Sequence, residues 1–187
     1  MLTGLISSLP GENIWRTTFA RSLTADSASG FQGFMCRQLI GPTLLTTSGN
    51  RLRLTLQAGS ADPVFIGNIY IGEQAPSGNP YDMDGGQVHV FYNGAATFTV
   101  PSGGSLVTDA VTFPLDITKT LIVSYFCTVG ANSQLRRSAI GTVPDASLYS
   151  QNNAGVDEAS VSVLPAGYNI SFQTEYLVNK IEVLVPA

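Results

Sequence analysis

Residues 51–72, RLRLTLQAGSADPVFIGNIYIG, decide the fold. In the first part, Leu52, Leu54 and Leu56 alternate with polar residues, which is the pattern of a strand with one buried face. Residues 58–63 break this alternation with Gly, Ser, Asp and Pro, and an apolar pattern resumes over residues 64–71. The stretch therefore predicts a hairpin, two strands joined by a turn.

The second strand of this hairpin is expected to be irregular. Its apolar phase slips between Ile66 and Ile69, across Gly67. Since a regular strand keeps a strict period of two, the slip predicts a β-bulge near Gly67.

Most of the chain repeats this scheme of short strands and turns, and no segment has a sustained helical period. Residues 121–127 are apolar on both faces, which indicates a central, buried strand. About nine strands with frequent turns predict an all-β protein, a jelly-roll-like β-sandwich. The expected core consists of apolar residues on the alternating strands: Leu52, Leu54, Leu56, Ile66, Val111, Phe113, Val123, Phe172, Ile181 and Val183.

The sequence predicts a division at residue 30, with an N-terminal arm over residues 1–30 and a β-sandwich domain over residues 31–187. The arm carries apolar side chains that are costly to leave in water: Leu5, Ile6, Ile14, Trp15 and Phe19. We expect these five residues to mediate assembly, with Trp15 as the anchor in a neighbouring subunit. Packing of the arm on its own domain is the alternative.

Composition narrows the classes of partner. Only 12% of the 187 residues are charged, the net charge is −4, and no basic cluster occurs beyond Arg136-Arg137. Because nucleic-acid binding needs clustered positive charge, we expect none. The N-terminus lacks the pattern of a secretory signal, and no apolar run reaches the ~20 residues of a membrane span. We therefore expect a protein made in a cytoplasm, without a membrane span.

The two cysteines, Cys36 and Cys127, are far apart in the sequence. Two buried thiols are the simpler interpretation, because a free cysteine packs like a small apolar residue. A disulfide between them is the alternative, since spacing alone does not decide between the two interpretations.

Catalytic and metal-binding patterns are weak. His89 is the sole histidine and lies within an expected strand, and no nucleophile elbow accompanies it. Asp82 and Asp84 offer oxygen ligands for calcium, but the rest of a calcium loop is missing, so a polar turn is favoured. We expect no enzyme, no cofactor and no metal site.

Carbohydrate binding is a further hypothesis, because aromatic faces stack on the apolar faces of sugar rings. Tyr81, Tyr92 and Tyr149 are the candidate residues. Tyr81 and Tyr149 are preferred, since they lie in expected loops.

Several stretches taken together resemble the non-catalytic N-terminal β-sandwich that precedes the catalytic domain of some SGNH (GDSL-type) esterases. The resemblance spans roughly residues 35–187 and rests on residues 36–38, 48–54, 65–67, 90–94, 98–104, 107–111, 121–125 and 181–185. It implies the fold of an accessory module. The chain departs from those enzymes because no Gly-Asp-Ser block and no Asp-x-x-His arrangement is present.

These observations predict a structural or binding module of an assembled particle: a bacteriophage virion protein, such as a capsid decoration, fibre or tail component, made in the host cytoplasm. We expect a homo-oligomer, a trimer by analogy, that contacts other virion proteins. The alternatives are a carbohydrate-binding module that contacts a cell-surface glycan, and an accessory domain for a separately encoded SGNH-type esterase. Either would also fit a cytoplasmic protein.

Overall fold

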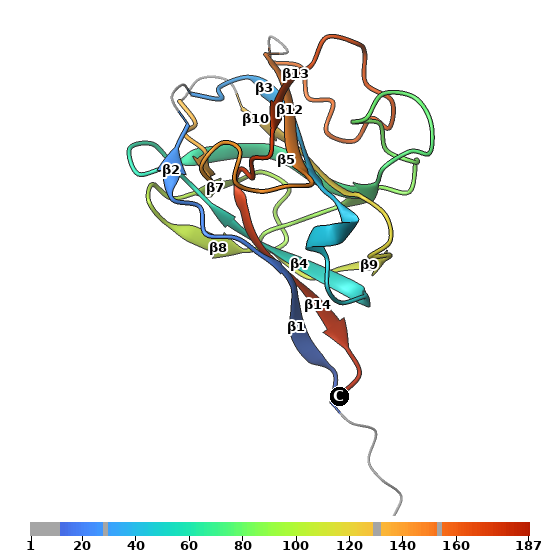
Figure 1. Ribbon diagram of the computed structural model, residues 1–187. Coiled ribbons are helices and arrows are strands. Elements are labelled where there is room, and N and C mark those ends of the chain that lie inside the picture. Colours follow the sequence, from blue (N-terminus) through green and yellow to red (C-terminus); the bar gives the residue numbers. More distant parts are fainter. Residues whose placement is uncertain (1–11, 28–29, 129–131, 153–154) are drawn as a thin grey trace, which may run out of the picture.

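The computed structural model describes residues 12–27, 30–128, 132–152 and 155–187 (Figure 1). These residues form β-strands and one turn of 3-10 helix, η1 (Pro42–Leu44). The strands are β1 (Ile14–Ala20), β2 (Ala25–Asp26), β3 (Phe34–Ile40), β4 (Gly49–Gln57), β5 (Val64–Glu73), β6 (Val88–His89), β7 (Phe98–Val100), β8 (Ser105–Val107), β9 (Val111–Leu115), β10 (Leu121–Cys127), β11 (Arg136–Arg137), β12 (Ala146–Asn152), β13 (Asn169–Phe172) and β14 (Val178–Val185). The expected all-β class is confirmed. In the described part of the chain, no helix has the length and apolar character needed to cross a bilayer.

Two antiparallel sheets form the sandwich. The smaller sheet has the order β1-β14-β4-β8, with β9 also paired to β4. The larger sheet has the order β13-β12-β3-β10-β5-β6, with β7 also paired to β5. The chain crosses between the sheets repeatedly, and the first and last strands are neighbours in the smaller one. This is the connectivity of a jelly roll, to which the β12–β13 hairpin adds two strands beside β3.

Residues 51–72 form two strands, as expected, but these strands do not make a hairpin. β4 belongs to the smaller sheet and β5 to the larger one, so residues 58–63 carry the chain from one sheet to the other. Within this crossing, the Gly59 amide donates to the Gln134 carbonyl at 2.7 Å. Alternation identified both strands correctly, but it reports which face is buried and not which strand lies beside it.

The bulge expected at Gly67 is confirmed. In the β5–β10 pairing, Phe126 lies opposite Asn68 while Cys127 lies opposite Ile66, so Gly67 is the extra residue. A Cβ at Gly67 would lie 2.7 Å from the Phe126 ring, which explains why glycine fits here. The expectation for residues 121–127 also holds, because β10 is buried along its whole length between β3 and β5.

The main core lies between the two sheets. Eight of the ten predicted core residues are buried there, namely Leu52, Leu54, Leu56, Ile66, Phe113, Val123, Ile181 and Val183. Val111 is partly buried against this core. Phe172 was expected in the core and is 64% exposed, because it lies on edge strand β13 and faces away from the smaller sheet. Cys36 and Cys127 are buried free thiols.

The boundary expected at residue 30 lies inside the fold. Strand β1 pairs with β14 along its length and is the first strand of the jelly roll. Phe19 is 3% exposed in the main core, and Leu23 is buried as well. Figure 1 shows β1 and the end of β14 side by side, extending from the sandwich towards the C-terminus. Residues 14–27 are therefore part of the domain and not an arm.

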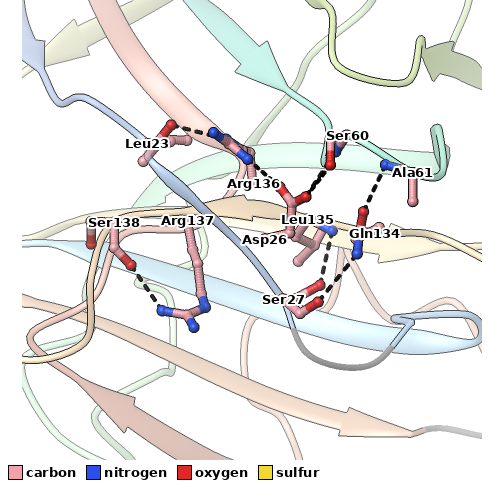
Figure 2. A network of polar contacts seen from close by, with 10 residues as sticks. All are labelled: Leu23, Asp26, Ser27, Ser60, Ala61, Gln134, Leu135, Arg136, Arg137 and Ser138. Atoms are coloured by element: carbon pink, nitrogen blue, oxygen red, sulfur yellow. Dashed lines mark hydrogen bonds and ion pairs between the residues drawn. The ribbon is translucent and has the colours of Figure 1, made fainter.

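A polar network fixes the chain just after β1 (Figure 2). Asp26 forms an ion pair with Arg136 and accepts hydrogen bonds from the Ser60 amide and hydroxyl. Arg136 also donates to the Leu23 carbonyl at 3.0 Å. These bonds hold the pKa of Asp26 at about 2, with the Ser60 hydroxyl as the largest cause and Arg136 next. The segment around residue 26 has the composition of a linker, yet it pairs with β11 and is hydrogen-bonded to the crossing between β4 and β5.

The outer face of the larger sheet has a second apolar cluster, covered by two long loops, residues 74–87 and 155–168. The cluster contains Met35, Leu39, Tyr81, Met83, Ile122, Phe126, Ala159, Leu164 and Tyr168. Arg37 on β3 is fully buried beneath the loops, and its guanidinium donates to the carbonyl oxygens of Tyr81, Val161 and Ser162. Burial lowers the pKa of Arg37 to about 10, while the carboxylates of Asp82 and Glu158 act in the opposite direction.

Candidate binding site

Five strands of the larger sheet have one end on the same side of the sheet, and a groove crosses the sheet there. This row of strand ends is called the edge below, and it is distinct from the side formed by edge strand β13. Five residues lie directly outside a strand at this edge, Gln74 after β5, Thr120 before β10, Gly41 after β3, Asp145 before β12 and Gln173 after β13. Together with Leu39, Ala146, Ser147 and Phe172, they line a hollow of about 400 Å³.

A second hollow of about 730 Å³ adjoins the first, because Gln74 and Thr120 line both. Its other lining residues come from η1 and from two loops: Pro42, Ala75, Pro76, Asp84, Thr118 and Lys119. We call the two hollows together the groove; Phe172 lines the first hollow, and Asp84 and Lys119 line the second. Both volumes lie within the range of ligand pockets, about 300–1,000 Å³.

Backbone hydrogen bonds hold the floor of the groove. The Gln74 amide donates to the Thr120 carbonyl at 3.0 Å, and the Gly41 amide donates to the Asp145 carbonyl at 2.8 Å. The Asp145 carboxylate accepts from the amide and the hydroxyl of Thr43, at 3.1 and 2.8 Å. A Cβ at Gly41 would lie 2.0 Å from the Asp145 carboxyl carbon, so only glycine allows this close approach.

Two residues of the groove wall have a strained backbone. Asp145 has a φ of 65° and Gln173 a φ of 53°, in the left-handed region that favours glycine. Such a conformation costs roughly 1–3 kcal/mol per residue and persists where surrounding bonds enforce it. At Gln173 the enforcing bonds are the amides of Thr142 and Val143, which donate to its carbonyl oxygen at 3.1 and 3.0 Å.

Phe172 supplies an aromatic side chain at the end of the groove. It lies opposite Ser147 in the β12–β13 pairing and is 64% exposed. The loops that cover the outer face do not bury it. An exposed ring beside amide, hydroxyl and carboxylate groups is an arrangement that can stack on one face of a sugar and hydrogen-bond its hydroxyls.

The charge of the groove is negative. Asp84 and Asp145 line it, while Lys119, the basic residue of the lining, is paired with Glu73. The hydrogen bond to Glu73 is the main cause that raises the pKa of Lys119. Asp116 lies close by and accepts from the amide and hydroxyl of Thr118, which lower its pKa.

The tyrosines proposed for carbohydrate binding lie elsewhere. Tyr81 is 5% exposed and packs on Tyr149 and Tyr168, with ring centroids 5.0 Å apart in each pair. Tyr149 is half-buried and lies on strand β12, not in the expected loop. Tyr92 is also half-buried and packs on Phe98, with centroids 5.7 Å apart. The structure thus brings Tyr81, on the loop of residues 74–87, onto Tyr149 of β12, whereas Tyr92 packs on Phe98.

His89 is a packing residue, as expected. Its ring stacks on Tyr70 at 4.4 Å between centroids and contacts Phe91 at 4.3 Å. Desolvation lowers its pKa, and in the described structure its buried Nε2 has no hydrogen-bond partner. Aromatic packing therefore accounts for the position of His89.

Asp82 and Asp84 form a polar turn, which was the favoured interpretation. Asp82 is buried and accepts from the amides of Asn79 and Leu164, at 2.8 and 3.1 Å, so it ties the two covering loops together. Asp84 accepts from the Gly86 amide at 2.9 Å. Among the residues that the structure describes, no group of three or more His, Cys, Asp or Glu side chains is placed to hold a metal.

The proposed assembly residues have different environments. Phe19 is buried in the core, whereas Ile14 and Trp15 are half-buried on β1. The Trp15 ring lies 4.3 Å from the guanidinium carbon of Arg53, which also pairs with Glu182 at 2.9 Å. Trp15 therefore has a partner within its own chain. Leu5 and Ile6 lie outside the described residues.

The sequence did not predict the groove, and of its lining it singled out Asp84 only as a weak candidate for calcium. Gln74, Thr120, Asp145 and Gln173 are ordinary polar residues at the ends of strands, and their common signal is only that position. Phe172 was expected in the core, as one of the apolar residues on the alternating strands. In comparisons with known proteins, no protein-family model matches the chain, and no curated protein matches it.

Proposed function

We propose that this chain is a non-enzymatic binding module that holds carbohydrate in the groove at the edge of the larger sheet. The observation that carries the proposal is the exposed Phe172 ring at the end of a polar groove. In this site, Phe172 stacks on a sugar ring, while Gln74, Asp145 and Gln173 hydrogen-bond its hydroxyls. The packing of His89 on the rings of Tyr70 and Phe91 supports a binding role over a hydrolytic one.

The setting that we propose is a bacteriophage virion, with the protein made in the host cytoplasm and the groove turned to a cell-surface glycan. Support comes from the low charged content and from the sequence resemblance to an accessory β-sandwich. An accessory role beside a separately encoded SGNH-type esterase is the alternative. The neighbouring reading frames distinguish the two, because the first predicts virion genes on both sides and the second a hydrolase gene.

Assembly into a homo-oligomer, with a trimer as the expectation, also belongs to this proposal. Since β1 is part of the sandwich, the residues left for docking on a neighbour are those before it, including Leu5 and Ile6. Native mass spectrometry tests the expectation, and a strictly monomeric protein would contradict it.

A glycan array followed by calorimetric titration tests the binding role. We expect weak binding of one glycan class and about fivefold weaker binding by Phe172→Ala, since an aromatic contact of this kind contributes about 1 kcal/mol. Val163→Ala is the matched control, because Val163 is 67% exposed and does not line the groove. No binding at millimolar glycan, or equal affinity of Phe172→Ala and wild type, would refute the proposal.

A further inference from the structure

We infer that the groove takes a neutral oligosaccharide across two adjoining subsites and discriminates against sugars that carry carboxylates. The inference rests on the proposed carbohydrate binding and adds the class and the length of the ligand. Two independent observations carry it, the shape of the groove and its charge.

The shape indicates a ligand longer than one ring. The hollows of about 400 and 730 Å³ share Gln74 and Thr120, so these two residues form a waist between two subsites. The side-chain amide of Gln74 is held in place by donating to the Pro80 carbonyl at 2.5 Å. A chain of sugar rings that passes over this waist contacts Phe172 at one end and Asp84 and Lys119 at the other.

The charge of the groove disfavours an anionic ligand. Asp84 and Asp145 belong to the lining, and Asp116 and Glu73 lie beside it. Lys119 is the basic residue of the lining, and its ammonium is engaged by Glu73. A ligand carboxylate would therefore meet several like charges and no free cation among the lining residues. Neutral hydroxyls have no such penalty and can donate to the same carboxylates.

Calorimetric titration with matched probes tests the inference. The probes are gluco-, galacto- and manno-oligosaccharides of one to five rings, together with the same series oxidised at C6 to carboxylates. For the series that binds, we expect Kd to fall about tenfold from one ring to four. We expect the oxidised series to bind about fivefold more weakly at low ionic strength, with the difference shrinking as salt is added.

Two variants connect the discrimination to the groove. Asp84→Asn keeps the oxygen that accepts from Gly86 and should reduce the difference between the neutral and oxidised series. Glu12→Gln makes the same charge change at an exposed residue outside the groove, and it should leave the difference unchanged.

The outcomes separate this inference from the proposed function. If the oxidised series binds as tightly as the neutral one, or a single ring binds as tightly as four, the inference fails while carbohydrate binding stands. If Asp84→Asn and Glu12→Gln behave alike, the assignment of the discrimination to the groove is overturned. If wild type binds no probe of either series and no glycan on the array, the proposed function fails and the inference with it.

Discussion

At the scale of single residues, the fold buries two ionisable groups in opposite ways. Arg37 keeps its charge because three carbonyl oxygens accept from its guanidinium. Glu175 is fully buried, and burial raises its pKa well above the ordinary value, with Arg21 as a weaker opposing influence. Its Oε2 accepts from Gln38 at 3.4 Å, and its buried Oε1 has no partner within the described structure. Burial therefore favours the protonated form of Glu175 in the native state.

This protonation predicts how stability depends on pH. The native state keeps a proton on Glu175 that the unfolded chain releases above pH 4.5, its ordinary pKa. The contribution of Glu175 to the free energy of unfolding is therefore complete below pH 4.5 and is lost as the pH rises through the raised pKa. Glu175→Gln stays neutral throughout, so its melting temperature should fall less between pH 5 and pH 8 than that of wild type.

Thermal melts over this pH range check the prediction, with the exposed Glu12→Gln as the control for a lost charge. Parallel pH profiles for wild type and Glu175→Gln would show that Glu175 is ionised in the native state, contrary to this account.

At the scale of elements, strand β1 and the loops over the outer face differ most from what the sequence suggests. The alternation of β1 is interrupted, because the pairing with β14 shifts register between Thr17 and Phe19. The shift puts the adjacent residues Thr18 and Phe19 both in buried positions, so the period of two disappears. By contrast, the phase slip at Gly67 was readable, since long apolar alternation flanks it on both sides.

The groove was harder to predict than the strands. Strand positions follow from alternation, but the residues at the edge meet only because β3, β5, β10, β12 and β13 lie in one sheet. Alternation does not specify that order, as the β4–β5 crossing also shows. The left-handed conformations of Asp145 and Gln173 have no sequence signal either, because neither residue is glycine.

Truncation tests the role of β1. A chain lacking residues 1–11 should remain folded, whereas a chain lacking residues 1–30 should lose its cooperative melt, because Phe19 and a whole strand are removed. Phe19→Ala alone should cost about 3–5 kcal/mol in the free energy of unfolding. Denaturant unfolding measures both effects. A stable, cooperative fold without residues 1–30 would show that β1 is dispensable.

The two loops that cover the outer face depend on Arg37, as the whole fold depends on β1. Arg37→Ala removes the donor to the carbonyl oxygens of Tyr81 and Val161, which should cost about 3 kcal/mol and loosen both loops. Hydrogen exchange should then accelerate over residues 74–87 and 155–168 more than in the smaller sheet. Uniform exchange across the molecule would mean that Arg37 does not hold the loops.

At the scale of the whole molecule, the covered middle of the larger sheet differs from the edge where its strands end. Loops cover the middle of the outer face of the larger sheet, and the groove lies where five of its strands end. The groove at this edge is lined by strand ends that are hydrogen-bonded across the sheet, together with η1 and two loops. The central claim is that this edge binds carbohydrate.

The most direct test is a titration of ¹⁵N-labelled protein with the neutral oligosaccharides, followed by amide chemical shifts. The account predicts that the shifts concentrate at Gly41, Gln74, Thr120, Asp145 and Gln173 and are lost in Phe172→Ala. Shifts that concentrate instead around Tyr81, Tyr92 and Tyr149, or spectra that do not change at millimolar oligosaccharide, would contradict it.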